Sequence, residues 1–114
     1  GVQANARASA VKNALVNGLK ECVVVAADNK TTNFNAAQSF ATAGAFQGYT
    51  MKQKNNNVNS CFSAWADATD DNADSDFNIE MNTATGAITK TCANNDRAGC
   101  DLPAGGQAGG AGIW

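Results

Sequence analysis

The sequence predicts an α+β domain in which one long N-terminal α-helix packs on an antiparallel β-meander that ends in a disulfide-bounded loop. Three observations support this class: a helical hydrophobic period over 1–27, strand-like segments over 49–92, and four cysteines, two of which enclose the short segment 92–100. A helix followed by a run of strands is typical of α+β folds. At 114 residues the chain is long enough for one domain with one modest core, so we treat 1–114 as a single domain.

Residues 1–27 form the predicted helix. Its apolar stripe recurs at spacings of three and four residues and comprises Val11, Leu15, Gly18, Leu19, Cys22 and Ala26. Alanines fill the first turns, where they favour helix formation and allow close helix–helix approach. The helix is expected to be roughly 39 Å long, which is more than a domain of this size needs. Val23, Val24 and Val25 make its last turn apolar all round, so we expect something to cover the outer side as well.

Residues 28–48 are predicted to connect the helix to the sheet. The segment opens with a polar run that favours the end of the helix. Three phenylalanines follow in a background of small residues: Phe34, Phe40 and Phe46. We expect these rings to hold the connection against the core, with a short helical turn at 35–39.

Residues 49–92 carry the predicted sheet. Four segments have strand-like composition or alternating apolar and polar side chains, namely 49–54, 58–66, 77–81 and 86–92. A turn is predicted at 55–57, an acidic loop at 67–76 and a hairpin connection at 82–86, where Gly86 suits a positive φ. The side chains expected to face the helix are Phe77, Ile79, Met81 and Ile88.

Residues 101–114 form a Gly-rich tail. The tail has no core-forming side chain before Ile113 and Trp114. Such a composition predicts a flexible segment, unless the terminal pair docks on the domain.

The four cysteines predict two disulfide bonds. An even number of cysteines in a small chain without histidine favours an oxidising compartment. Four cysteines allow three pairings. Turn-forming residues between Cys92 and Cys100 favour that pair and leave Cys22 with Cys61. Free buried thiols in a cytosolic protein are the alternative.

The composition argues against several classes of function. Histidine is absent, which removes the commonest general base and the commonest zinc ligand, and no serine lies in a GxSxG motif. We therefore expect no enzyme and no cofactor. A net charge of −2 argues against binding to nucleic acid or anionic membranes, because Lys52 and Lys54 with Tyr49 form at most a small basic patch.

The acidic loop is the candidate metal site. Asp70, Asn72, Asp74 and Asp76 place oxygen ligands at alternating positions, as calcium loops do. An EF-hand loop needs glycine at its sixth position and glutamate at its twelfth. Ser75 and Met81 stand at these positions, so a solvated surface loop is the favoured interpretation and calcium binding the alternative.

The order of these elements, with the segment ASAVKNALVNGLKECVVVAAD at 8–28, resembles the soluble part of a type IV pilin or a related pseudopilin. Segment 8–28 is similar to the exposed half of the family's N-terminal helix. Residues 31–47 are similar to its variable loop, 49–92 to its meander and 92–100 to its disulfide-bounded loop. Family members begin with an apolar segment that bears an early glutamate. The sequence lacks this segment, so we expect a truncated or processed form.

The resemblance implies a structural subunit of an extracellular cell-surface pilus, held in the inner membrane before assembly through the segment that is absent here. Such a subunit self-associates through its helix into a filament that serves adhesion or surface display. The helix residues expected to form the filament contact are Val11, Leu15, Leu19, Val23, Val24 and Val25. Two alternatives stay open: a pseudopilin of a type II secretion system, and a secreted, disulfide-linked module that binds a small ligand or surface sugar.

Overall fold

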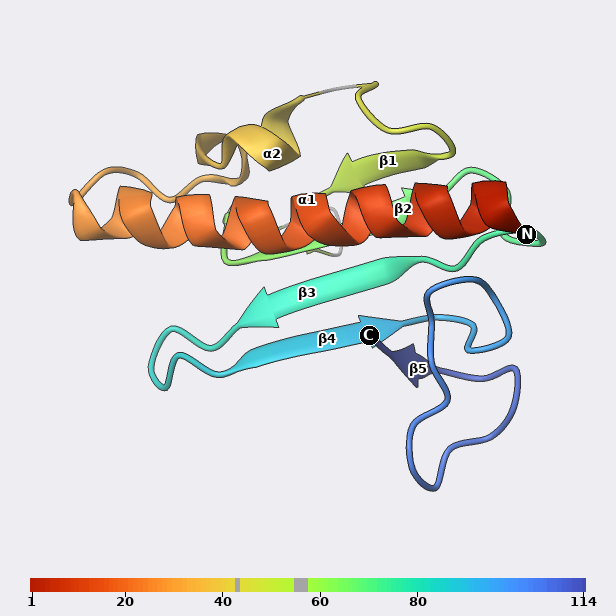
Figure 1. Cartoon of the computed structure of the whole chain (residues 1–114). Helices are drawn as coiled ribbons and strands as arrows, with labels where there is room; N and C mark the ends of the chain where they lie inside the picture. The colour runs from red at the N-terminus through yellow and green to blue at the C-terminus, as the bar shows by residue number, and fades with distance from the viewer. Residues whose placement is uncertain (43, 55–57) are drawn as a thin grey trace.

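The computed structural model describes residues 1–42, 44–54 and 58–114. Helix α1 (Val2–Ala27) crosses one face of a five-stranded antiparallel sheet (Figure 1). The other elements are η1 (Phe34–Ala36), α2 (Gln38–Ala41), β1 (Tyr49–Lys52), β2 (Ser63–Ala68), β3 (Phe77–Met81), β4 (Ile88–Cys92) and β5 (Gly112–Ile113). The predicted α+β class is confirmed. None of the helices among the described residues has the length and apolarity needed to cross a membrane.

Helix α1 follows the predicted stripe. Ala8, Val11, Leu15 and Leu19 are buried against the sheet, and Cys22 continues the same side toward the C-terminal end. At about 1.5 Å per residue, its 26 residues nearly span the 42 Å long axis of the molecule. The helix ends where Asn29 takes a positive φ of 56°, a conformation that asparagine tolerates better than most residues.

The sheet is a simple meander in the order β1-β2-β3-β4-β5, and each strand pairs antiparallel with the next. Alternation assigns its two faces. Phe77 and Ile79 on β3 are buried toward α1, opposite Ala66 and Ala64 on β2. The residues between them point to the other side of the sheet.

Three strands have boundaries that differ from the prediction. Strands β1 and β4 are shorter, ending at Lys52 and beginning at Ile88. Strand β2 runs over Ser63–Ala68 instead of 58–66, because Cys61 is bonded to the helix and its backbone N–H donates to the carbonyl of Thr32 rather than to a strand. Strand β3 and the positive φ of Gly86, 77°, match the sequence expectation. The predicted turn at 55–57 lies outside the described residues.

The connection between α1 and β1 packs through its phenylalanines. The rings of Phe34 and Phe40 stack with their centroids 5.3 Å apart, and both are buried. Phe40 lies against the backbone of Gly18, so that a Cβ atom at Gly18 would stand 2.2 Å from a ring carbon. The predicted turn at 35–39 is therefore realised as η1 and α2, which lie on either side of Ala37.

The C-terminal tail is anchored at its end. Gly112 and Ile113 form β5 against β4, and the indole N–H of Trp114 donates to the carbonyls of Asn78 and Thr91. The Trp114 ring meets Phe77 edge-on, with centroids 6.1 Å apart. The terminal pair thus docks, which is the condition under which the sequence predicts an ordered tail.

Two disulfide bonds staple the fold. Cys22–Cys61 joins the end of α1 to the segment before β2, and Cys92–Cys100 closes the loop after β4. The favoured pairing is confirmed, and the free-thiol alternative is wrong for this structure. Disulfides of this kind persist in oxidising compartments.

Candidate functional site

The candidate filament contact separates into a buried and an exposed part. Val11, Leu15 and Leu19 are at most 3% exposed because they form the core beneath the sheet, so they are unavailable to a second subunit in this fold. This corrects half of the predicted set. Val23 is 44% exposed and Val24 61% exposed, whereas Val25 is partly buried. The apolar end of the helix therefore remains uncovered on one side.

The rest of the outer side of α1 carries small or uncharged side chains. We call this surface the outer helix face; its exposed members are Val2, Gln3, Ala6, Ser9, Ala10, Asn13, Asn17, Lys20, Val23 and Val24. Lys20 is the only charged residue of α1 that is mostly exposed. Small uncharged side chains let two helices approach closely and leave few charges to desolvate.

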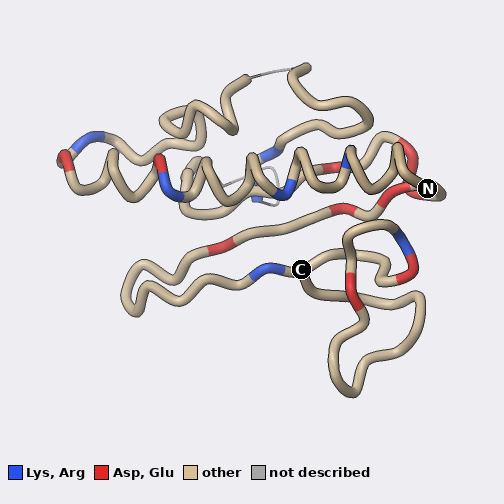
Figure 2. The backbone as a smooth tube through the Cα atoms, in the orientation of Figure 1, with Lys and Arg blue, Asp and Glu red and all other residues tan. Residues whose placement is uncertain are grey.

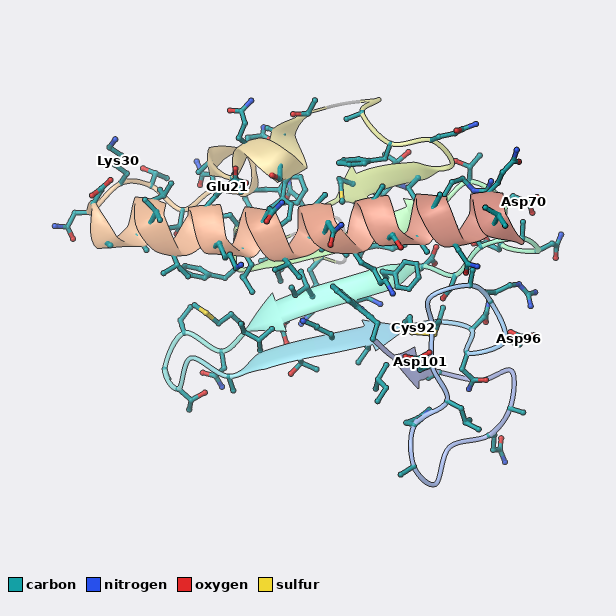
Figure 3. The ribbon with its side chains drawn as sticks, viewed as in Figure 1. Glu21, Lys30, Asp70, Cys92, Asp96 and Asp101 are labelled. Atoms are coloured by element: carbon teal, nitrogen blue, oxygen red, sulfur yellow. A yellow bond between two sulfur atoms is a disulfide. The ribbon has the colours of Figure 1, made fainter. Side chains whose placement is uncertain are left out.

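The remaining charges of α1 are held by the domain itself. Arg7 pairs with Asp74, and Lys12 Nζ donates to the carbonyl of Gly99 over 3.1 Å. Glu21 accepts a 2.9 Å hydrogen bond from the backbone N–H of Ser39 at the start of α2, as its position beside that helix in Figure 3 suggests. These contacts turn charge away from the outer helix face and leave that face nearly neutral.

A shallow groove of about 310 Å³ borders the outer helix face near its N-terminal end. Gln3, Ala6 and Ala10 form one wall, and Phe46 with Gln47 forms the other. Residues 45–47 could not be placed beside the helix from the sequence, because this contact joins segments about forty residues apart and leaves no local pattern. Arg7, which is paired with Asp74, also lines the groove, so the outer helix face is bordered here by an aromatic ring and a compensated charge.

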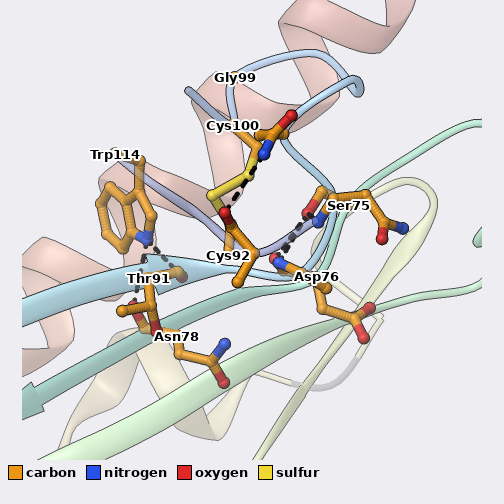
Figure 4. The surroundings of a disulfide bond; sticks show 12 residues. Ser75, Asp76, Asn78, Thr91, Cys92, Gly99, Cys100 and Trp114 are labelled. Carbon is orange, nitrogen blue, oxygen red and sulfur yellow. Dashed lines mark hydrogen bonds between the residues drawn. A yellow bond between two sulfur atoms is a disulfide. The ribbon is translucent and has the colours of Figure 1, made fainter. Parts of the chain in front are cut away.

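The loop closed by Cys92–Cys100 is fixed to both layers. Ser75, which is fully buried, accepts hydrogen bonds at its hydroxyl from the backbone N–H groups of Ala93 and Asn94, each over 3.1 Å (Figure 4). Lys12 binds the far end of the loop at Gly99, whose positive φ of 79° suits glycine. The loop therefore has a defined position at one end of the molecule.

The four predicted calcium ligands do not converge. Asp74 is buried and makes a two-bond ion pair with Arg7, at 3.1 Å to Nε and 3.0 Å to Nη2. Asp70 instead accepts a hydrogen bond from the backbone of Asn72. The acidic loop lies beside the N-terminal end of α1 (Figure 2), where Arg7 reaches it. The alternating pattern is thus accounted for by a turn and an ion pair.

A different set of carboxylates comes together in this region. Asp67, Asp71 and Asp76 bring oxygens within 4.8 Å of one another. Burial raises the pKa of Asp76, and the neighbouring carboxylates of Asp71 and Asp67 raise it further. The hydrogen bond that Asp76 accepts from the backbone N–H of Ala68, at 2.7 Å, lowers this pKa. Asp67 is already paired with Lys52 at 2.6 Å. Two of these three carboxylates therefore already have partners within the domain: Asp76 has the backbone N–H of Ala68, and Asp67 has Lys52.

The charges of the small basic patch considered from the sequence are compensated by neighbouring carboxylates. Lys52 pairs with Asp67 and Lys54 pairs with Glu80, while Tyr49 is buried and donates its hydroxyl to the carbonyl of Ser75. The positions of Lys and Arg are spread along the chain (Figure 2).

Comparison with protein-family models, with curated proteins and with solved structures finds no match for this chain.

Proposed function

We propose that this protein is a structural subunit of an extracellular pilus-like filament, of the type IV pilin kind, and that it self-associates through the outer helix face. The observation that carries the proposal is a helix nearly as long as the whole molecule whose exposed side is small and almost uncharged, and whose C-terminal end exposes Val23 and Val24. Exposed neutral helices of this length are a favourable surface for helix–helix packing.

The geometry supports a filament with helices inside and sheets outside. Helix α1 covers one face of the sheet only, so the opposite face and the Cys92–Cys100 loop stay free when helices pack together (Figure 1). The two disulfides suit an extracellular setting, because disulfides persist in oxidising compartments and stabilise a small domain.

Immunogold labelling of producing cells tests this proposal. Antibodies raised against the folded chain are expected to decorate long surface fibres at regular intervals. Label confined to the culture medium, on a monomeric protein, would contradict the proposal and favour the secreted binding module. Label on short envelope-bound stubs that form only while a secretion system is active would favour the pseudopilin.

A further inference from the structure

The face of the sheet that points away from α1 carries a trough of about 390 Å³. Its lining side chains include Lys54, Trp65, Asn78, Glu80, Thr89 and Thr91. They come from three neighbouring strands and from the segment after β1. The volume lies within the range of about 300–1,000 Å³ that small-molecule sites occupy.

Strand register sets these side chains in rows. Trp65 on β2 is directly opposite Asn78 on β3, which is opposite Thr91 on β4. Glu80 and Thr89 form the adjacent pair on the same side. With neighbouring strands about 4.8 Å apart, the row places an aromatic side chain about 10 Å from a hydroxyl, with an amide between them. Figure 4 shows Asn78 and Thr91 on the side of the strands away from Trp114.

Trp65 offers the trough an apolar surface rather than a hydrogen-bond donor. The indole N–H of Trp65 is occupied by the carbonyl of Gln53, at 2.9 Å. Lys52 lies over the ring from β1, 5.4 Å from its centroid, whereas the trough extends from Trp65 on β2 across β3 to β4. What Trp65 presents to the trough is therefore a partly exposed hydrocarbon wall.

The polar members keep their hydrogen-bonding capacity. The side chains of Asn78, Thr89 and Thr91 form no hydrogen bond with another described residue, and each can both donate and accept. The nearby charges are largely compensated, because Lys54 pairs with Glu80 and Lys52 with Asp67. The trough thus combines one apolar wall with several uncharged partners that are free to bind.

We propose that this trough binds a neutral pyranose sugar. A pyranose has a C–H face that packs on an aromatic ring and a rim of hydroxyls that both donate and accept, which matches Trp65 on one side and the amide and hydroxyls on the other. The acidic side chains Asp76 and Glu80 at the trough disfavour an anionic sugar. The inference goes beyond the proposed filament and does not depend on it, although a sheet that faces outward leaves the trough accessible.

The test is a titration of the folded, oxidised chain by two-dimensional ¹H–¹⁵N NMR. The probes are methyl β-D-glucopyranoside, methyl β-D-galactopyranoside and N-acetyl-D-glucosamine, with sorbitol as an acyclic polyol and glucuronate as a charged sugar. At least one neutral pyranose is expected to cause saturable shifts centred on the amides of β3 and β4, with a dissociation constant of about a millimolar. Equal shifts with sorbitol, shifts centred elsewhere, or no saturable shift with any of the three would overturn the proposal.

Variants locate the binding. Thr91→Val keeps the shape of an exposed side chain and removes its hydroxyl. The loss of one hydrogen bond is expected to weaken the affinity for the sugar about 5–10-fold. Thr83→Val, on the exposed connection between β3 and β4, is the matched control and should leave affinity unchanged. Because both sites are exposed, both variants should retain the parent's dispersed spectrum. Equal affinity for Thr91→Val and the parent would contradict the assignment of this trough.

Discussion

The clearest stability prediction concerns Ser75, whose hydroxyl joins three backbone groups. The side chain is fully buried, accepts from the N–H groups of Ala93 and Asn94 at 3.1 Å, and donates to the carbonyl of Asp76 at 2.9 Å. Replacing Ser75 with alanine removes all three bonds while leaving the backbone fold intact. The acidic loop and the start of the Cys92–Cys100 loop then keep one direct bond, from the backbone N–H of Ala93 to the carbonyl of Asp76 at 3.2 Å, and lose the attachment through the hydroxyl.

The magnitude follows from the number of bonds. A hydrogen bond contributes about 1 kcal/mol net, and a buried group left unpaired costs about 1–3 kcal/mol. Because the N–H of Ala93 and the carbonyl of Asp76 still bond to each other in Ser75→Ala, the three lost bonds give a destabilisation of about 2–3 kcal/mol. That is a large part of the roughly 5–15 kcal/mol that stabilises a typical domain. In equilibrium urea unfolding, followed by tryptophan fluorescence with both disulfides intact, the midpoint of Ser75→Ala should fall by about 1–3 M.

A Ser→Ala control at an exposed site separates the loss of the Ser75 hydrogen bonds from any general effect of replacing serine by alanine. Ser9 is exposed on α1, where alanine is the better helix former by a few tenths of a kcal/mol. Ser9→Ala should therefore unfold at the same urea concentration as the parent or slightly above it. A loss below about 1 kcal/mol for Ser75→Ala would refute the assignment of Ser75 as the joint between these loops.

Three further perturbations test other parts of the structure. Burial raises the pKa of Tyr49, with the carboxylates of Asp74 and Asp76 adding to the shift, so the folded chain keeps a phenolic proton that the unfolded chain loses near pH 10. The stabilisation is fully present below pH 10 and is lost as the pH rises above it. The free energy of unfolding, measured with a chemical denaturant, should therefore fall less above pH 10 for Tyr49→Phe than for the parent. Gly18→Ala should lower thermal stability despite alanine's helix propensity, because its Cβ would meet the Phe40 ring; a rise in melting temperature would contradict the close packing. Replacing both cysteines of Cys22–Cys61 by serine should cost more than replacing both of Cys92–Cys100, about 4 against about 2.5 kcal/mol in the chain-entropy treatment, and the reverse order in urea unfolding would count against it.

The parts of the fold that local pattern determines could be predicted from the sequence. The stripe through Val11, Leu15 and Leu19 repeats at the helical period, and the alternation around Ile79 gives β3 its two faces. The turn residues inside Cys92–Cys100 indicated a short disulfide loop. In each case the residues that decide the structure are close together in the sequence.

The parts that distant contacts determine could not be predicted. Strand β5 contains only a glycine and one apolar residue. It forms because the Trp114 ring packs against Phe77 and its indole N–H donates to two strand carbonyls. The acidic loop has the spacing of a cation site, but Asp74 is taken by Arg7, which is 67 positions away. Alternation of apolar residues likewise gave no sign that the start of β2 would be displaced by the bond from Cys61 to the helix.

The candidate filament surface was only half predictable for the same reason. Hydrophobicity alone joined Val11 and Val24 in one set, although the first lies under the sheet and the second is 61% exposed. Which valines face a neighbour depends on where the sheet lies on the helix, and that is set by long-range packing. The exposed valines and the neutral outer helix face are therefore the surface on which the account depends.

Fibre formation by a Val24→Lys variant in producing cells tests that account most directly. A lysine at this exposed position leaves the isolated chain as stable as the parent but places a charge in the helix–helix contact, where it must be desolvated. Thr83→Lys, exposed on the β3–β4 connection, adds the same charge away from the helix. We predict that Val24→Lys gives folded protein and few or no fibres while Thr83→Lys gives normal fibres; abundant fibres from both variants would contradict assembly through the outer helix face.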